Sequence, residues 1–325
     1  MEPLLRVQNL SVSFETENGI VCSVRGVDLT VNPGEILALV GESGCGKSVT
    51  ALSVLRLLPS PPALFESGSI HFCGKNLLEL SESEMQLIRG NDIAMIFQEP
   101  MTSLNPILTI GDQIGETILL HNNISAKESR QRTLEILKKV AIPSPENRID
   151  QYPHELSGGM KQRVMIAMAI SCNPKLLIAD EPTTALDVTI QAQILELLAD
   201  LQQDIGMAIL LITHNLGVVA EYANRVSVMY SGKIVEESRT QYLFETPAHP
   251  YSKGLLNSLP NVLEGNRLTP IPGVVPDPTE LPLGCAFQPR CSVALPHCEE
   301  KNPTFLNLEE FKAGHKAACF LHEPA

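Results

Sequence analysis

The sequence lacks the features that mark membrane-spanning, secreted and nucleic-acid-binding proteins. None of its apolar runs reaches the roughly 20 residues that a membrane-spanning helix needs. Residues 1–6 do not have the pattern of a secretory signal peptide, so we expect the chain to act in the cytosol. Basic residues are few, because 24 Lys and Arg stand against 37 Asp and Glu and give a net charge of −13. A surface that binds nucleic acid needs clustered positive charge, so nucleic acid is not an expected partner.

Internal repeats and low-complexity tails are also missing. The first 30 residues alternate apolar and polar positions, as half-buried antiparallel strands do. Continuous apolar runs at 176–179 and 208–212 are separated by a segment of helical periodicity, which predicts an α/β core with buried parallel strands. Beyond about residue 245, prolines become frequent and periodicity fades. We therefore predict an α/β domain over residues 1–245 and a smaller, loop-rich appended module over residues 246–325.

The most informative stretch is the glycine-rich segment 41–48, with the sequence GESGCGKS. It follows the apolar run 36–40, which predicts a buried strand, and it precedes residues 49–58, which predict a helix. Strand, glycine loop and helix in this order form the context of a phosphate-binding loop, because backbone N–H groups converge on phosphate at a helix N-terminus. Lys47 is expected to reach the β- and γ-phosphates, and the Ser48 hydroxyl to ligate Mg²⁺. The residues expected to contact the nucleotide are Gly41, Ser43, Gly44, Cys45, Gly46, Lys47, Ser48 and Val49. The segment predicts a site for a nucleoside triphosphate.

Two acidic residues, Asp180 and Glu181, follow the buried apolar run 176–179. In phosphate-loop ATPases an aspartate at this place holds the metal, and a following glutamate orients or deprotonates the attacking water. A strand that ends in two acids can also be ordinary loop chemistry. The phosphate loop upstream favours the catalytic interpretation.

The segment 156–163, LSGGMKQR, resembles the signature sequence of ATP-binding cassette proteins, with Met160 where glutamine is commonest. Taken in isolation, its serine and glycines are equally well explained as a simple helix cap. The resemblance implies that Ser157, Gly158 and Gly159 of one cassette close over the phosphate loop of another. It therefore implies a second ATPase subunit as partner, in a heterodimer or a homodimer.

Other positions fall into the order of the same family. The resemblance implies that Gln98 senses Mg²⁺ and the attacking water, and that Asp187 belongs to a loop that contacts the partner cassette. It implies that His214 holds the γ-phosphate and the catalytic carboxylate in register. Phe14 is the aromatic residue expected to stack on adenine, with a plain core phenylalanine as the alternative. The implied fold is a P-loop NTPase core with a helical subdomain at about 99–169 and an antiparallel β subdomain.

Within the family, the sequence is similar to the ATPase subunits of bacterial dipeptide and oligopeptide importers. The stretches that carry this similarity are 97–106, 152–156, 180–189, 249–251 and 284–291. Asn215 and Glu99 depart from the aspartates that are frequent at those positions, and neither change removes a catalytic group.

The similarity implies a peripheral subunit on the cytoplasmic side of the inner (plasma) membrane that hydrolyses ATP to drive peptide uptake. Its partners would be two transmembrane permease subunits and, indirectly, an extracytoplasmic solute-binding protein. The region between Gln98 and Glu155 is expected to receive a short helix of a permease, although Met101, Leu104, Ile107 and Leu108 there are equally candidates for the core. Nickel, glutathione or another small solute is the alternative cargo. An ATPase outside transport is less expected, because such relatives carry two cassettes or a long coiled coil.

Four of the eight cysteines gather in the proline-rich C-terminal segment: Cys285, Cys291, Cys298 and Cys319. Disulfides are not expected in a reducing cytosol. The spacing C-x5-C-x6-C-x20-C is wider than that of zinc knuckles and suits a [4Fe–4S] cluster, which the family resemblance also implies. Zinc, with His297, His315 or His322 replacing one thiolate, and ordinary buried thiols are the alternatives. A structural role is favoured because a module of this size has a small core.

Overall fold

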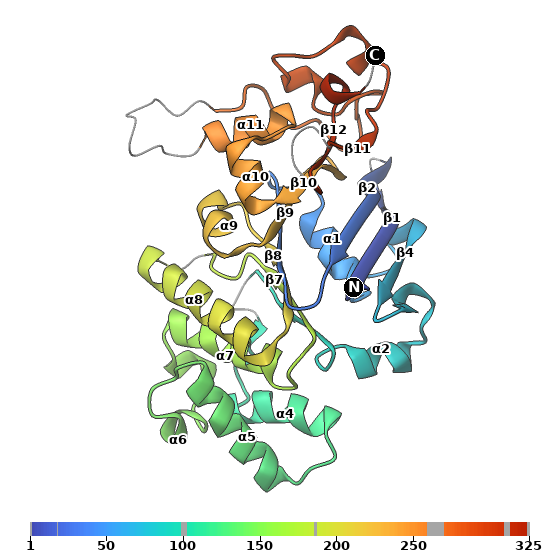
Figure 1. The fold of residues 1–325 in the computed structure, drawn as a ribbon. Coiled ribbons are helices and arrows are strands. Elements are labelled where there is room, and N and C mark those ends of the chain that lie inside the picture. Colours follow the sequence, from blue (N-terminus) through green and yellow to red (C-terminus); the bar gives the residue numbers. More distant parts are fainter. Residues whose placement is uncertain are drawn as a thin grey trace. The chain divides into compact units, whose positions relative to one another are not determined.

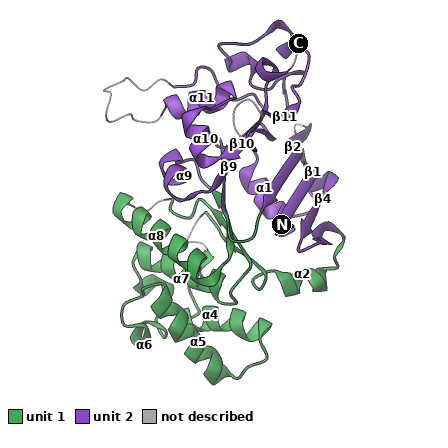
Figure 2. Ribbon diagram, in the orientation of Figure 1, with its two compact units in different colours: residues 1–4, 32–35, 79–212 green, residues 5–31, 36–78, 213–325 purple. Residues whose placement is uncertain are grey.

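The computed structural model describes residues 2–17, 19–98, 103–184, 187–258, 270–308 and 313–323 (Figure 1). The chain divides into two compact units, coloured separately in Figure 2. Unit 1 comprises residues 1–4, 32–35 and 79–212, and unit 2 comprises residues 5–31, 36–78 and 213–325. Among the described residues, no helix combines the length and the apolar character that crossing a bilayer requires.

Unit 1 is built on three parallel strands in the order β8–β7–β6. They are β6 (Ile93–Ile96), β7 (Leu176–Asp180) and β8 (Ala208–Ile212), and every residue of β7 and β8 is buried. Its helices are α2 (Glu82–Ile88), α4 (Ile110–His121), α5 (Ala126–Lys139), α6 (Pro145–Arg148), α7 (Gly158–Ile170) and α8 (Val188–Ile205). The predicted buried parallel strands and the helix between them are confirmed.

Local sequence explains where the helices of unit 1 begin. Capping boxes start α4 at Thr109 with Asp112, and α5 at Ser125 with Glu128, so each helix satisfies two otherwise orphaned backbone donors. Gly206 ends α8 in a left-handed conformation. Helices α4, α5 and α7 pack against one another (Figure 1).

Unit 2 contains an antiparallel sheet in the order β2–β1–β4–β5. Its strands are β1 (Leu5–Thr16), β2 (Gly19–Val31), β4 (Ala63–Phe72) and β5 (Lys75–Asn76). A second set of strands runs in the order β3–β9–β10–β12–β11. Its members are β3 (Ile36–Val40), β9 (Arg225–Tyr230), β10 (Lys233–Arg239), β11 (Phe305–Asn307) and β12 (Lys316–Ala318), and only β3 and β9 pair in parallel. The predicted N-terminal antiparallel strands are confirmed.

The helices of unit 2 are short: α1 (Lys47–Val54), α9 (Leu216–Tyr222), α10 (Thr240–Glu245) and α11 (Pro250–Asn257). Helix α1 stops four residues before the predicted end at residue 58, since Leu55 caps it and Pro59 follows shortly after.

The C-terminal segment shares a hydrophobic core with the strands of unit 2. Tyr251 and Phe287 belong to the same buried cluster as Val40 and Tyr230. Ring centroids lie 4.6 Å apart for Tyr230 and Tyr251, and 5.4 Å apart for Tyr251 and Phe287. Contacts between aromatic rings stabilise a fold beyond the stabilisation that comes from burying the apolar surface of the rings. The segment therefore shares its core with β9 and with β3, the strand that leads into the glycine-rich loop.

Candidate functional site

The glycine-rich loop lies between β3 and α1, as predicted. Gly46 adopts φ +105°, and a Cβ atom on it would lie 2.4 Å from the carbonyl oxygen of Ser23. Only glycine fits there, because both the backbone angle and the close approach exclude a side chain. Lys47 begins the helix, and its ammonium donates to the carbonyl oxygens of Gly41 at 2.8 Å and Glu42 at 3.0 Å. The Lys47 side chain thus folds back over the glycine-rich loop, where it is predicted to bind the phosphates of the nucleotide.

A cavity of about 240 Å³ in unit 2 reaches the tip of this loop. Ser43 and Gly44 line one part of it, and the segment 275–278 lines another. The C-terminal segment therefore contributes surface beside the predicted nucleotide loop.

In unit 1, the end of β7 carries the two predicted acids. Asp180 is the last residue of the strand and is 5% exposed. Glu181 follows with φ +46°, a left-handed conformation that is uncommon for a residue other than glycine and is often found at functional sites. Its carboxylate accepts hydrogen bonds from the amide of Gln98 at 3.0 Å and the hydroxyl of Thr184 at 2.9 Å. The structure thus brings together the predicted base and the predicted water-sensing glutamine.

The signature segment of unit 1 forms the start of α7. Ser157 is the N-cap and accepts from the N–H of Met160 at 3.4 Å, so the capping interpretation is confirmed. Ser157 and Gly158 are exposed, which leaves them accessible to another molecule. Gln162, one turn later, donates to the carbonyl of Pro182, close to the acidic strand end. The signature helix is thus tied to the segment that carries Glu181.

Asp187 and His214 lie at the starts of helices. Asp187 caps α8 and accepts from the N–H of Ile190 at 3.0 Å. In unit 2, His214 is exposed just before α9, which Asn215 caps by accepting from the N–H of Gly217 at 2.9 Å. The asparagine keeps a capping function that the more frequent aspartate would also supply.

Phe14 lies in β1 of unit 2 and is half-buried, so it is not a fully buried core residue. Glu99 and Met101 lie outside the described residues.

The four C-terminal cysteines line one narrow cavity of unit 2. Its walls are otherwise mainly apolar, with Val293 and Phe320 among them. Burial raises the pKa of Cys319 to about 11, and the charges of the other three cysteines act in the same direction. Among the described residues, however, no group of three or more His, Cys, Asp or Glu side chains is close enough to hold a metal ion. The four thiols share one cavity, but the predicted metal site is not formed in the part of the chain that the structure describes.

The histidines named as alternative zinc ligands have other contacts. His315 Nε2 lies 2.7 Å from Glu236 Oε1, and both side chains are fully buried. His322 lies 3.2 Å from the carbonyl oxygen of Ala248, and His297 packs edge-to-face on Phe320.

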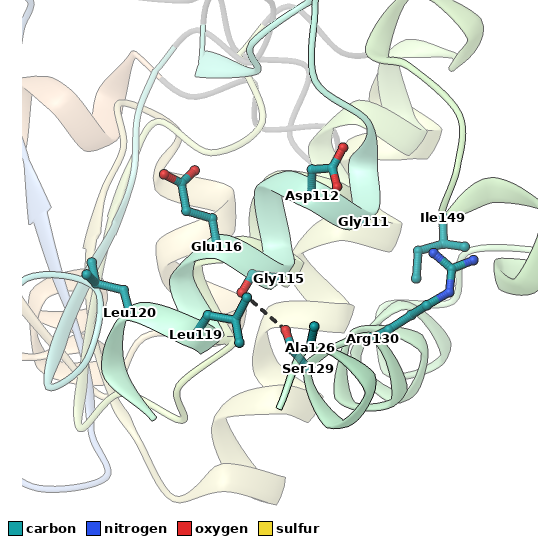
Figure 3. A pocket seen from close by; sticks show the side chains of 10 residues that line it. All are labelled: Gly111, Asp112, Gly115, Glu116, Leu119, Leu120, Ala126, Ser129, Arg130 and Ile149. Atoms are coloured by element: carbon teal, nitrogen blue, oxygen red, sulfur yellow. Dashed lines mark hydrogen bonds between the residues drawn. The ribbon is translucent and has the colours of Figure 1, made fainter. Parts of the chain in front are cut away.

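A larger cavity, of about 620 Å³, lies on α4 and α5 of unit 1 (Figure 3). Leu119 and Leu120 stand on one side of it, with Leu120 75% exposed. Ser129 of α5 donates to the carbonyl oxygen of Gly115 at 3.2 Å and joins the two helices, as the dashed line in Figure 3 marks. The cavity falls within the region predicted to receive a permease helix.

Sequence reasoning missed two residues that contact the glycine-rich loop, Arg290 and Tyr251. Arg290 forms a salt bridge with Glu42, and the hydroxyl of Tyr251 accepts from the Glu42 N–H. Both residues lie in stretches that resemble the importer subgroup, 284–291 and 249–251, which was the available signal. The family resemblance included these two stretches, but it implied no role for the side chains of Arg290 and Tyr251.

Comparison with known families yields two matches along the chain. The family described as ABC transporter matches residues 24–184. The family described as oligopeptide/dipeptide transporter, C-terminal region, matches residues 235–298.

Curated proteins match over almost the full length. A probable peptide ABC transporter ATP-binding protein of Sinorhizobium fredii is 54% identical over 98% of this chain and 94% of its own. The oligopeptide transport ATP-binding protein AppD of Bacillus subtilis is 52% identical over 99% of this chain and 98% of its own. Among solved structures, a dimeric ATP-binding cassette in a post-hydrolysis state with ADP and Pi is 27% identical, with a TM-score of 0.65, over 73% of this chain and 98% of that one.

Proposed function

This chain belongs to the ABC transporter family of ATP-binding subunits, and from that premise we propose that it hydrolyses ATP to drive the import of dipeptides or oligopeptides. Its P-loop NTPase fold is that of the ABC ATPases. The observation that carries the peptide assignment is the C-terminal match over residues 235–298, which lies beyond the general cassette match. The names of the relatives that match along almost the whole chain agree with it.

We propose that the glycine-rich loop binds the triphosphate. Lys47 would exchange its two carbonyl contacts for phosphate oxygens, which its ammonium reaches as a point charge. Ser48, Asp180 and Gln98 would hold Mg²⁺, which neutralises charge on the phosphates when bound. Phe14 would stack on the adenine.

Glu181 is the proposed general base. Its carboxylate is already oriented by two hydrogen bonds, from Gln98 and Thr184, so a water held there meets a fixed acceptor. His214 would keep this carboxylate and the γ-phosphate in register.

The proposed cleavage requires a second ATPase subunit. The exposed Ser157 and Gly158 would offer hydroxyl and backbone N–H donors to the phosphates bound by that partner, at the start of α7 where the helix dipole favours anions. Asp187 would lie in the loop that contacts the partner.

Two permease subunits complete the proposed assembly, with this chain peripheral on the cytoplasmic side of the inner membrane. The cavity on α4 and α5 supports this, since exposed leucines and a volume of about 620 Å³ suit the end of a short helix. A solute-binding protein outside the membrane would deliver the peptide.

We also propose that Cys285, Cys291, Cys298 and Cys319 hold a [4Fe–4S] cluster, with zinc as the alternative. Support comes from their shared, largely apolar cavity and from the four thiolates that such a cluster takes. The bound cluster would cross-link a loop-rich segment that has few regular elements of its own.

The test is peptide uptake by the complex reconstituted with its permeases in vesicles. Glu181→Gln should leave ATP binding intact and slow turnover by about 10²- to 10⁴-fold, the usual contribution of a general base. Glu196→Gln, on the exposed face of α8, is the matched control and should keep normal turnover. Undiminished hydrolysis by Glu181→Gln rejects its role. ATP-driven uptake of nickel or glutathione without uptake of peptides rejects the proposed cargo.

A further inference from the structure

Glu42, the second residue of the glycine-rich loop, is held at every polar group. Its N–H donates to the hydroxyl of Tyr251 at 2.9 Å. Its carbonyl oxygen accepts from Lys47 Nζ at 3.0 Å and from the N–H of Cys45 at 3.3 Å. Its carboxylate forms a bidentate pair with Arg290, at 2.6 Å and 3.0 Å. Two of these partners, Tyr251 and Arg290, come from the C-terminal segment.

Arg290 is fixed in turn by its own surroundings. Its Nε donates to the carbonyl oxygen of Pro272 at 3.0 Å, and its Nη1 lies 3.4 Å from the hydroxyl of Tyr230. The guanidinium carbon also stands 5.8 Å from the centre of the Tyr230 ring. The side chain of Arg290 is only 4% exposed, and that of Glu42 is 30% exposed. A planar guanidinium with this many contacts has one orientation, so the position of Glu42 follows from that of Arg290.

The backbone around Arg290 links it to the cysteine-lined cavity. Arg290 lies in a short turn in which Gln288 N–H donates to the Cys285 carbonyl at 2.9 Å, and Cys291 N–H donates to the Gln288 carbonyl at 3.1 Å. Cys285 N–H donates to the carbonyl of Cys298 at 2.9 Å. Three of the four cysteines are thus joined through the backbone to the turn that presents Arg290.

We propose that Arg290 is a positioning residue for the phosphate-binding loop, through which the cysteine-lined C-terminal segment sets the affinity for nucleotide. Arg290 holds the Glu42 carboxylate, Glu42 fixes the path of the loop, and the loop presents its N–H groups to phosphate. The inference rests on the proposed nucleotide site but not on peptide cargo or on iron. All the interactions that connect the cysteine-lined segment, Arg290 and the glycine-rich loop lie within unit 2.

The test measures the dissociation constant of a fluorescent ATP analogue on the purified full-length chain. Arg290→Ala should weaken binding by about tenfold, a typical coupling between groups in one hydrogen-bonded network. Arg290→Lys keeps the charge but cannot pair bidentately, so it should fall between Arg290→Ala and the wild type. Glu42→Gln should weaken binding similarly, and adding it to Arg290→Ala should cause little further loss, because both remove the same contact.

A second readout is amide hydrogen exchange of residues 41–46, which should become faster in the Arg290 variants and stay unchanged in the control. That control is Arg89→Ala, which breaks another arginine–glutamate pair, Arg89 with Glu82, in unit 1. A melting temperature measured on each variant shows that it is folded at the assay temperature. If Arg290→Ala is too unstable, Arg290→Lys and Glu42→Gln carry the test.

If the folded Arg290 variants bind the nucleotide analogue with wild-type affinity, the proposal is overturned. Arg290 would then only stabilise the fold. Independent, additive losses in Arg290→Ala and Glu42→Gln overturn it as well. Lys47→Ala separates this failure from failure of the nucleotide site, since unchanged affinity in Lys47→Ala would show that nucleotide does not bind at the loop.

Discussion

Acid should destabilise this protein through His249, a buried residue at the start of α11. Its Nδ1 accepts from the N–H of Tyr251 at 3.0 Å and so caps the helix as a neutral ring. His249 is 1% exposed, and burial lowers its pKa from 6.5 to about 4. Between these values the unfolded chain binds a proton that the folded chain does not, so stability is complete above pH 6.5 and is lost as the pH falls toward 4.

The size of the effect follows from the same two values. Lowering the pH from 7.5 to 5.5 should remove about 1.4 kcal/mol from the free energy of unfolding. Because pH 5.5 lies above the folded-state pKa, this figure depends mainly on the unfolded-state value of 6.5. The range also stays above the sequence pI of about 5.1, where solubility is lowest.

Urea unfolding at several pH values between 7.5 and 5.5 measures this loss, with His249→Asn as the matched variant. Asparagine can still accept the Tyr251 N–H as an N-cap but does not titrate. The variant should be less stable at every pH, yet it should lose about 1.4 kcal/mol less than the wild type across the range. Parallel pH profiles for the two proteins would refute the reasoning.

Two further predictions concern the cysteines and the glycine-rich loop. Cys291→Ser should remove brown absorbance at about 400 nm from anaerobically purified protein, whereas Cys73→Ser, at an exposed cysteine, should keep it. A colourless wild-type protein that contains zinc would reject the iron assignment. Gly46→Ala should lower the free energy of unfolding by about 1–3 kcal/mol and weaken nucleotide binding, since its Cβ would lie 2.4 Å from the Ser23 carbonyl oxygen. Gly206→Ala is the control for backbone strain alone, because Gly206 also has a positive φ but its added Cβ would have no atom within 4 Å. Equal melting temperatures in the two variants would contradict the role of close packing at Gly46.

Much of the fold could be predicted from the sequence, because strands buried on both faces leave continuous apolar runs. The runs at 36–40 and 208–212 coincide with β3 and β8. The end of α1 was less predictable, since Leu55, Leu57 and Leu58 continue the apolar pattern after the helix stops at Val54. Hydrophobic pattern marks what is buried and does not mark where the backbone turns.

Some features of the candidate site could likewise be predicted from the sequence, and others could not. The sequence by itself determined the glycine loop, the two acids at the end of the β7 strand and the serine cap of α7, because each depends on residues adjacent in the chain. Only the tertiary structure decided that Arg290 pairs with Glu42 across 248 positions, that Gln98 meets Glu181, and that four cysteines share a cavity. Contacts between residues that are distant in the sequence depend on how the helices and strands pack. This packing produces no periodic pattern among neighbouring residues, so the sequence alone does not predict it.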